Sequence, residues 1–184
     1  MSYVYQRTVS IPEDVTVEIN GNEVKVKGPK GELSRQFERI SCVIERENDN
    51  IVISDYFTKK KQKGVIGTVA GHLNNMIKGV RTGYVYHLKI IFSHFPIEVE
   101  HDKKSGKLKI KGLYGYKGMK SVPIPKDVKL AIEGEDIRVE GVNLEKVSQT
   151  AARIQETCRL RGKRKKDDKT FQDGIYVYKK DLGN

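Results

Sequence analysis

Residues 11–28 are Ile-Pro-Glu-Asp-Val-Thr-Val-Glu-Ile-Asn-Gly-Asn-Glu-Val-Lys-Val-Lys-Gly, and residues 124–141 are Ile-Pro-Lys-Asp-Val-Lys-Leu-Ala-Ile-Glu-Gly-Glu-Asp-Ile-Arg-Val-Glu-Gly. Eight of the eighteen positions are identical. The identical pairs are Ile11/Ile124, Pro12/Pro125, Asp14/Asp127, Val15/Val128, Ile19/Ile132, Gly21/Gly134, Val26/Val139 and Gly28/Gly141. Such a match between distant stretches of one chain is typical of an internal duplication.

Each of the two stretches predicts a β-hairpin. Apolar and polar residues alternate through Val15, Val17 and Ile19 and again through Val24 and Val26, which is the period of a strand with one buried face. A glycine lies between the two alternating runs in both stretches, and it tolerates the positive φ that a tight turn requires. Both hairpins are therefore expected to be antiparallel.

The rest of the pattern predicts further strands and two helices. Strands are expected at residues 33–37, 42–47 and 51–56 in the first half and at residues 84–92, 97–100 and 107–111 in the second half. Apolar residues at helical spacing predict one helix across residues 65–80 and another across residues 144–157. Gly79 and Gly83 suit the end of the first helix.

These elements predict an α+β fold made of two similar small domains from an internal duplication. Each domain is expected to be an antiparallel sheet packed with one helix. We place the first domain at residues 1–82, the second at residues 83–157, and a basic C-terminal tail at residues 158–184. A chain of 184 residues is long enough for two small domains, each with a modest core.

The composition favours a polyanionic partner. Lys and Arg number 35 against 24 Asp and Glu, which gives a net charge of +11. Cationic side chains that neutralise phosphates release condensed counterions, so nucleic acid is the leading partner class. The sequence has neither an apolar run of about 18 residues nor a basic amphipathic helix, so we expect no membrane partner.

The N-terminus and the cysteines indicate a reducing compartment. Residues 1–7 lack the apolar core of a signal peptide, which places the chain in the cytoplasm or the nucleus. Cys42 and Cys158 are the two cysteines of the chain and lie far apart, which favours reduced thiols over a disulfide framework.

The tail carries the densest charge. Residues 159–166 hold six cations in eight positions, and these repel one another unless they are solvated or face phosphates. Taken alone, such a run is equally compatible with a disordered, solubilising or nuclear-import segment. An aromatic and basic mixture follows at residues 171–180, which can dock on the protein body or stack on bases. We expect Ile175 and Val177 to dock.

Two other basic stretches are weaker candidates. One runs from Lys103 to Lys120 and ends in the glycine-rich residues 112–121, where glycines let a backbone approach phosphates closely. A flexible loop with solvated lysines explains the same pattern. The other stretch, residues 59–63, precedes the first helix, where cations oppose the helix dipole and solvation again explains them.

Catalytic patterns are missing from the sequence. Gly118-Met-Lys-Ser121 is followed by Pro123 and Pro125, which forbid the helix that a phosphate-binding loop or a dinucleotide fingerprint requires. The four histidines, at positions 72, 87, 94 and 101, lack zinc-site spacing, and there is no nucleophile elbow. We therefore expect no enzyme activity, metal, cofactor or small-molecule substrate.

Several motifs carry a family resemblance that spans essentially the whole chain. They are Val26-Lys-Gly-Pro-Lys-Gly31, Asn75-Met-Ile-Lys-Gly-Val80, His94-Phe-Pro-Ile97 and Lys169-Thr-Phe-Gln-Asp-Gly-Ile-Tyr-Val177. With them the chain resembles the universal large-subunit ribosomal protein L-six family, called L-nine in eukaryotes. The last motif is similar to the eukaryotic and archaeal branch.

The resemblance implies a non-catalytic constituent of the large ribosomal subunit that binds rRNA near the sarcin–ricin loop and the stalk base. It implies neighbouring ribosomal proteins as partners, and residence on cytoplasmic ribosomes, with nuclear and nucleolar assembly in a eukaryote. It places rRNA contacts on the second domain and tail, at Lys117, Lys120, Arg159, Arg161, Lys163, Arg164, Lys165, Lys166, Lys169 and Phe171. Secondary contacts with rRNA or protein are expected at Lys27, Lys30, Lys59, Lys60, Lys61 and Lys63.

The sequence leaves two alternatives open. A free-standing nucleic-acid-binding regulator would share the charge pattern, whereas a phosphate-handling enzyme would lack a base, a nucleophile and a metal site. The two copies are also expected to differ in their contacts. When the alignment of residues 11–28 with residues 124–141 is continued at the same offset, Lys27 and Lys30 match Glu140 and Asn143, so the Lys-Gly-Pro-Lys-Gly turn is not repeated with the hairpin.

Overall fold

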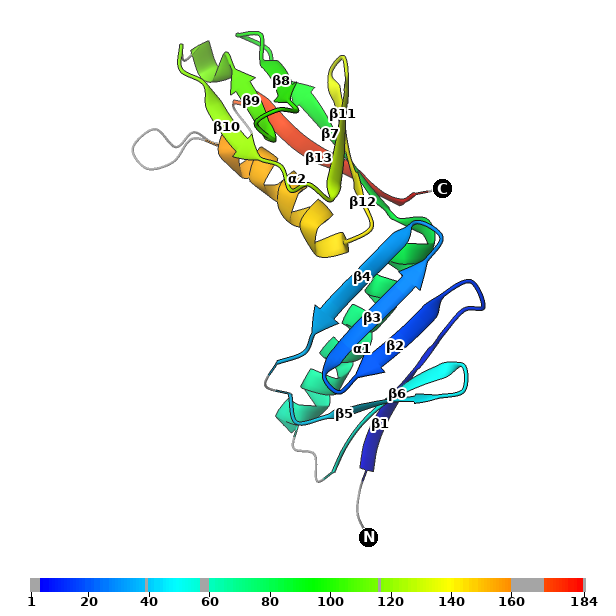
Figure 1. Cartoon of the computed structure of the whole chain (residues 1–184). Helices are drawn as coiled ribbons and strands as arrows, with labels where there is room; N and C mark the ends of the chain where they lie inside the picture. The colour runs from blue at the N-terminus through cyan, green and yellow to red at the C-terminus, as the bar shows by residue number, and fades with distance from the viewer. Residues whose placement is uncertain (1–3, 39, 57–59, 116, 160–170, 184) are drawn as a thin grey trace. The chain divides into compact units, whose positions relative to one another are not determined.

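The computed structural model describes residues 4–38, 40–56, 60–115, 117–159 and 171–183. The chain forms two compact units, residues 1–83 and residues 84–184 (Figure 1). Both units combine antiparallel sheets with one long helix, so the expected α+β fold is confirmed. Among the described residues, no helix is long and apolar enough to cross a membrane.

The first unit has two three-stranded sheets and one helix. One sheet has the order β1-β6-β5 and the other the order β2-β3-β4, and all neighbours are antiparallel. The elements are β1 (Val4–Ser10), β2 (Thr16–Asn20), β3 (Glu23–Gly28), β4 (Gly31–Gln36), β5 (Val43–Glu47), β6 (Asn50–Tyr56) and α1 (Lys60–Thr82). The inward residues of β3 and β6 are buried with the apolar stripe of α1, as alternation and helical spacing predict.

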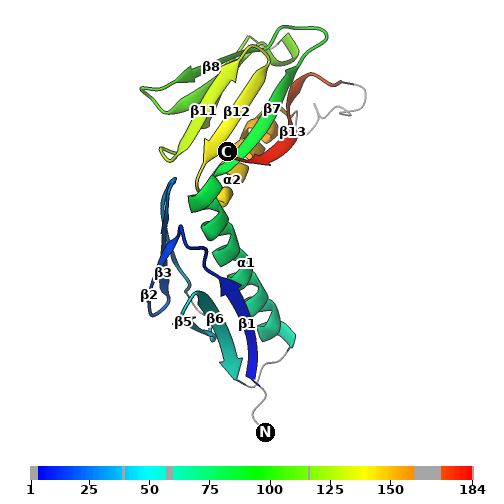
Figure 2. The same ribbon diagram turned by 90° about the vertical axis from the view of Figure 1, so that its right-hand side faces the viewer.

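The second unit has a four-stranded sheet of order β11-β12-β7-β13 and a three-stranded sheet of order β10-β9-β8. Its elements are β7 (Tyr84–Ile91), β8 (Glu98–Asp102), β9 (Lys107–Lys111), the short 3-10 turn η1 (Leu113–Gly115), β10 (Lys120–Pro123), β11 (Val128–Glu133), β12 (Asp136–Gly141), α2 (Leu144–Cys158) and β13 (Gly174–Leu182). Figure 2 shows β13 running beside β7 along the sheet, and the antiparallel register confirms it.

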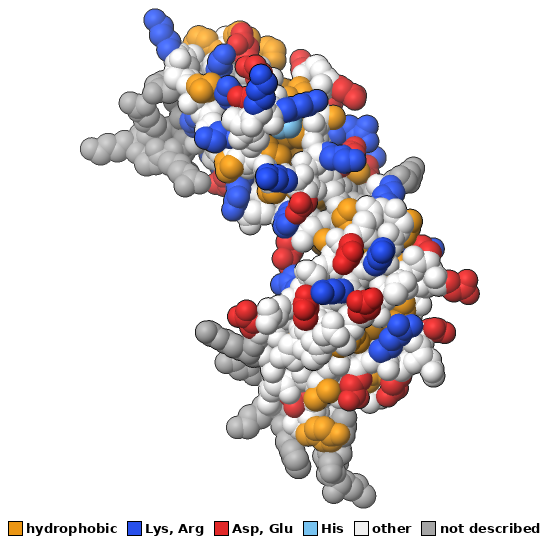
Figure 3. All heavy atoms as spheres, viewed as in Figure 1, with side chains coloured by type: hydrophobic (Ala, Val, Ile, Leu, Met, Phe, Trp, Pro, Cys, Tyr) orange, Lys and Arg blue, Asp and Glu red, His pale blue; other side chains and the backbone are white. Residues whose placement is uncertain are grey.

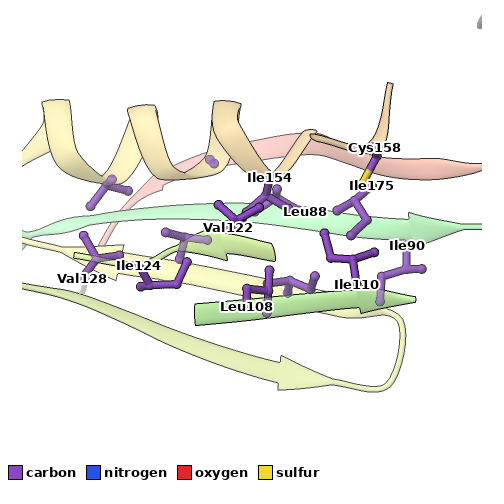
Figure 4. Close-up of a cluster of buried hydrophobic side chains, with 14 of the residues drawn as sticks. Leu88, Ile90, Leu108, Ile110, Val122, Ile124, Val128, Ile154, Cys158 and Ile175 are labelled. Carbon is purple, nitrogen blue, oxygen red and sulfur yellow. The ribbon is translucent and has the colours of Figure 1, made fainter. Parts of the chain in front are cut away.

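The core of the second unit lies between α2 and the two sheets. Figure 4 shows Ile154 and Cys158 pointing from α2 toward strand residues such as Leu88 and Ile175. All four side chains are almost completely excluded from solvent. Each fully buried aliphatic side chain contributes about 1.5–3 kcal/mol of transfer free energy, so this cluster holds helix and sheets together.

Helix α2 begins at a sequence-encoded cap. The Asn143 side-chain oxygen accepts hydrogen bonds from the backbone N–H groups of Glu145 (2.9 Å) and Lys146 (3.2 Å). Two of the otherwise unpaired amides of the first turn are thereby satisfied, and Glu145 complements the helix dipole. Helix α1 ends at Gly83, which has a φ of 76° and donates its N–H to the Gly79 carbonyl at 2.9 Å.

The two cysteines are buried free thiols, one in each unit. Burial raises the pKa of the Cys158 thiol to about 11 and also raises the pKa of Cys42. Both groups stay protonated and inert at neutral pH, as the expectation of reduced thiols requires.

The two domains repeat one order of elements, but not in the alignment that the hairpins suggest. Each unit consists of a first strand, a three-stranded meander, a hairpin that pairs with the first strand, and a helix. Strands β1 to β6 with α1 therefore match β7 to β12 with α2. In this order the β2–β3 hairpin corresponds to β8–β9, whereas the β11–β12 hairpin corresponds to β5–β6. The duplication is confirmed, and the pairing of residues 11–28 with residues 124–141 as equivalent positions is wrong.

The two matched stretches share local packing instead. In both, the valine of the Ile-Pro-x-Asp-Val turn donates its N–H to the proline carbonyl, at 3.0 Å for Val15 and 3.1 Å for Val128. The aspartate of each turn pairs with a cation on the helix, Asp14 with Arg81 and Asp127 with Lys146. Arg81 lies in the last turn of α1, but Lys146 lies in the first turn of α2. The same turn thus packs against opposite helix ends.

Three strands were not predicted. Strand β1 begins within residues 1–7, for which the sequence predicts no element, and β10 begins inside the glycine-rich residues 112–121. Strand β13 lies in the expected tail, where Ile175 is fully buried and Val177 packs on the core, so the predicted docking of these two residues is confirmed. Residues 174–182 of the expected tail are therefore part of the second unit's sheet.

Truncation of Ile175 to alanine tests whether β13 is integral to the fold. We expect the free energy of unfolding to fall by about 2–5 kcal/mol, because the change opens a cavity under α2. The matched control Leu182→Ala, at an exposed position of the same strand, should change it by less than about 0.5 kcal/mol. Urea unfolding followed by circular dichroism measures both, and equal effects would show that β13 does not support the core.

Candidate nucleic-acid interface

Four segments meet at one end of the second unit, which we call the loop end. They are the β7–β8 loop (residues 92–97), the β9–β10 loop (residues 112–119), the end of α2 (residues 157–159) and the residues before β13 (171–173). Ile91, the last residue of β7, pairs with Gly174, the first residue of β13, so the strands bring these segments together. Figures 1 and 2 both show this clustering.

Two glycines let the β7–β8 and β9–β10 loops interlock. Gly112 has a φ of 80°, and a Cβ at this position would lie 2.1 Å from the Pro96 carbonyl oxygen. Gly115 has a φ of 72°, and a Cβ there would lie 3.0 Å from the Phe95 ring. Side chains other than hydrogen would force the loops apart, so the glycines serve close packing between protein loops.

A buried carboxylate joins the β7–β8 loop to the chain before β13. Asp173 is only 2% exposed, and its Oδ1 accepts the Ser93 backbone N–H at 3.0 Å. The same oxygen lies 3.6 Å from His94 Nδ1, and the His94 ring lies 6.1 Å from the Phe171 ring. Asp173 therefore holds the chain before β13 against the β7–β8 loop, and this keeps Phe171 beside His94.

The loop end exposes aromatic and apolar side chains next to cations. Phe92 is 42% exposed, Phe95 49% and Met119 52%, and Lys117 and Arg159 are exposed among them. Figure 3 shows Lys and Arg side chains beside hydrophobic ones on the visible face of the second unit. Cations bind phosphates and aromatic rings stack on unpaired bases, so the pairing of the two suits a nucleic acid.

The structure separates the predicted second-unit contacts into different roles. Lys117 is exposed in the β9–β10 loop. Lys120 lies half-buried in β10 and donates from Nζ to the Thr157 carbonyl at 2.6 Å, which satisfies an unpaired carbonyl at the end of α2. Arg159 is exposed, caps α2 and forms an ion pair with Glu156 at 2.8 Å. Arg161, Lys163, Arg164, Lys165, Lys166 and Lys169 lie outside the described residues.

Several other lysines of the second basic stretch lie away from the loop end. Lys109 pairs with Asp102 at 2.9 Å, and this hydrogen bond raises the pKa of Lys109. Lys103 and Lys104 are exposed in the β8–β9 turn, at the opposite end of β9 from the loop end. The stretch is therefore not one continuous surface.

The predicted first-unit contacts fall into two groups. Lys27 and Lys30 are exposed at the β3–β4 turn, where the Lys30 backbone N–H donates to the Val80 carbonyl at 2.9 Å. Lys60 is exposed at the start of α1, and the Lys63 ammonium lies 5.2 Å from the centre of the Tyr5 ring. Lys61 also lies in α1, and Lys59 lies outside the described residues.

The element order changes how the two copies compare. The β3–β4 turn with Lys27 and Lys30 corresponds to the β9–β10 loop with Lys117. Lys30 contacts the end of α1 through the Val80 carbonyl, and Lys120, the first residue of β10, contacts the end of α2 through the Thr157 carbonyl. The comparison of these lysines with Glu140 and Asn143 is therefore wrong, because it rests on non-equivalent hairpins. Both copies carry a glycine–lysine connection at the same place in the fold.

Sequence reasoning missed the exposed side chains of the β7–β8 loop. His94 enters the sequence analysis only within a family motif, and Phe92 and Phe95 are not among the predicted site residues. The available signal was the run Phe92-Ser-His-Phe-Pro96, in which two aromatic residues stand in a loop where burial by strand alternation ends. No group of three or more potential metal ligands occurs among the described residues.

The comparison with protein families matches this architecture. The family model described as "Ribosomal protein L6" matches residues 11–83 and 95–166. The matched segments begin just before β2 and just before β8, the elements that the structure makes equivalent. The chain belongs to the ribosomal protein L6 family.

Archaeal relatives agree with this membership. The large ribosomal subunit protein uL6 of Staphylothermus marinus is 44% identical over 180 residues, covering 97% of this chain and 95% of the relative. The protein of the same name from Desulfurococcus amylolyticus is 46% identical over 173 residues, covering 94% and 92%. That of Aeropyrum pernix is 43% identical over 175 residues, covering 95% and 93%.

Membership in the L6 family answers the broad functional questions. The chain is a non-enzymatic structural component of the large ribosomal subunit, as the sequence predicts. Its partners are rRNA and other ribosomal proteins, and its place is the cytoplasmic ribosome. The predicted resemblance to the eukaryotic and archaeal branch agrees with the archaeal relatives.

Substitution of Lys120 and of Lys117 distinguishes a lysine that stabilises the fold from a lysine that is exposed to a partner. Lys120→Met should lower the free energy of unfolding by about 1.5 kcal/mol, because it removes a charge-assisted hydrogen bond and leaves the Thr157 carbonyl unpaired. Lys117→Met should change it by less than about 0.5 kcal/mol, since Lys117 is exposed. Urea unfolding compares the two, and equal stabilities would contradict the structural role of Lys120.

Proposed function

We propose that the loop end, with the basic segment of residues 159–166, binds large-subunit rRNA near the sarcin–ricin loop and the base of the stalk. The binding fixes rRNA helices through phosphate contacts and shape, with little reading of base sequence. Lys117, Arg159, Arg161, Lys163, Arg164, Lys165, Lys166, Lys169 and Phe171 are the residues to which we assign contacts.

One observation carries this proposal: the chain lies at the loop end both before and after residues 160–170. Arg159 leaves the end of α2, and Phe171 returns beside His94. Six cations stand between these two residues in the sequence, and the described chain that flanks them lies at the same end of the unit as Lys117 and the exposed rings of Phe92 and Phe95. A phosphate backbone that meets this end of the unit faces cations and stacking surfaces together.

Lys120 has a different place in the proposal. Its ammonium holds the end of α2, so it orients the origin of the basic segment and serves rRNA binding through position. The first-unit lysines 27, 30, 59, 60, 61 and 63 are secondary candidates for rRNA or protein contacts. The location near the sarcin–ricin loop and the stalk base follows from the family resemblance. Because the relatives named above are archaeal, the proposal includes no nucleolar stage.

Sedimentation of a cell lysate tests the ribosomal role of this chain. A tagged copy should co-sediment with large subunits at one copy per subunit and should remain bound through a moderate salt wash. Crosslinking on those subunits should then identify rRNA at or beside the sarcin–ricin loop. A mainly free pool would instead support the alternative of a free-standing nucleic-acid-binding regulator.

Neutralisation of the basic segment tests the site. Removal of residues 159–184 would also remove β13, so a cleaner variant replaces Arg161, Lys163, Arg164, Lys165 and Lys166 by glutamine. Binding to an rRNA fragment that contains the sarcin–ricin loop should weaken, and the slope of log affinity against log salt should flatten by roughly one for each lost phosphate contact. Filter binding across a series of KCl concentrations measures both quantities.

The control for this variant replaces Lys59, Lys60, Lys61 and Lys63 of the first unit by glutamine. It changes the net charge by a similar amount, but the proposal places the main phosphate contacts elsewhere. Its salt slope should therefore stay close to that of the unchanged protein. Equal slopes in the two variants would refute the assignment of the contacts to the tail segment.

A further inference from the structure

The equivalent sheets of the two units differ at one edge. In the second unit, the outer edge of β7 is covered by the antiparallel strand β13. In the first unit the equivalent strand, β1, is the last strand of the order β1-β6-β5, so among the described strands none pairs with its outer edge. An edge strand presents unpaired N–H and C=O groups that can pair with another chain.

The helices of the two units align position by position. The buried residues Ile66, Val69, Ala70, Leu73 and Ile77 of α1 have the same spacing as Val147, Thr150, Ala151, Ile154 and Cys158 of α2. The same alignment matches Gly67, Ala70, Gly71 and Asn74 with Ser148, Ala151, Ala152 and Gln155. It therefore shows which side of α1 faces the β1 edge.

The α2 residues of that second set line the space beside β13. Ser148, Ala151, Ala152 and Gln155 form a groove of about 400 Å³ with Val177 and Lys180 of β13 and with Tyr86. Gln155 Oε1 also accepts the Val177 backbone N–H at 3.1 Å. On this side of α2, small side chains leave room for the strand β13, and the Gln155 amide forms a hydrogen bond with it.

At the matching positions, helix α1 carries even smaller side chains than α2. A Cβ added at Gly67 or Gly71 would have no other atom within 4 Å, so the unit itself does not require glycine there. Glycine inside a helix costs about 1 kcal/mol relative to alanine, and it permits close approach of another backbone. Asn74, which matches Gln155, supplies an amide on the same side.

Charge indicates what kind of segment fits this edge. Arg7 pairs with Ile53 in the register, as Tyr86 pairs with Val139, so Arg7 occupies the place of Tyr86. Lys180 of β13 covers Tyr86, with its ammonium 5.4 Å from the ring centre. Arg7 is exposed, and the cation Lys63 lies nearby over Tyr5. In the second unit, the added strand β13 brings the cation Lys180 to the ring of Tyr86. In the first unit the cations Arg7 and Lys63 belong to the unit itself, so a strand added at the β1 edge would face them.

From these observations we infer that the outer edge of β1 accepts an extended, acidic segment of a neighbouring protein as a fourth antiparallel strand beside α1. Backbone hydrogen bonds provide the pairing, the glycines of α1 admit the backbone, and Arg7 and Lys63 select carboxylates. The inference rests on the proposed ribosomal role, because it places the partner among the proteins of the assembled large subunit.

A glycine substitution tests this docking. Gly67→Gln adds a side chain where the occupant would lie, whereas the control Gly64→Gln adds the same side chain at a position that matches Glu145, which does not line the groove beside β13. Both positions have open space in the free chain, and both changes improve helix propensity. Neither variant should therefore lose stability as an isolated protein.

Hydrogen exchange compares each protein free and in purified large subunits. In the unchanged protein and in Gly64→Gln, outward amides of residues 4–10 should exchange at least about tenfold more slowly in subunits, because they gain hydrogen bonds. In Gly67→Gln this protection should disappear while the protein still co-sediments. Unchanged exchange of β1 on subunits would overturn the inference.

A photo-crosslinker at Gln6 identifies the occupant. A crosslink to one acidic segment of another subunit protein, together with the protection of β1, would support the inference. A crosslink to rRNA or to a second copy of the chain would overturn it while leaving the ribosomal role intact. Failure of the unchanged protein to co-sediment would overturn both, so the two failures are distinguishable.

Discussion

The pairing of β13 with β7 is the constraint on which the second unit depends. It runs from Gly174 opposite Ile91 to Leu182 opposite Tyr84 and buries Ile175 against α2. Because β7 is the first strand of the unit and β13 the last, this ladder joins the two ends of the unit's chain in the sheet that packs against α2. It also decides where the basic segment must return, since the start of β13 is fixed at the end of β7. The pairing of β13 with β7 therefore determines both the order of the sheet and the place where the chain rejoins the unit after the basic segment.

Much of the fold could be predicted because its signals are local. Alternation at Val15, Val17 and Ile19 and the helical spacing of Ile66, Val69 and Leu73 report burial directly. The register of the duplication could not be predicted in this way. The Ile-Pro-x-Asp-Val turn recurs because it makes the same local hydrogen bond and ion pair at two different places, so local identity exceeded the identity between truly equivalent elements.

The candidate site was only partly predictable for a related reason. Charge density identifies Arg159 and Lys117, since exposed cations are visible in composition. It cannot distinguish them from Lys120, whose role depends on a carbonyl of α2 that lies 37 residues away in the chain. The sequence does not identify Phe92 and Phe95 as site residues, because most aromatic side chains are buried. Their exposure depends on how the two loops interlock at Gly112 and Gly115.

The return of the chain into β13 means that the basic segment is a closed loop and not a free end. Because the chain on both sides of residues 160–170 belongs to the same unit, the cations between these two points cannot lie far from the loop end. The core strand β13 thereby decides the place of charges that the sequence alone would assign to a free tail.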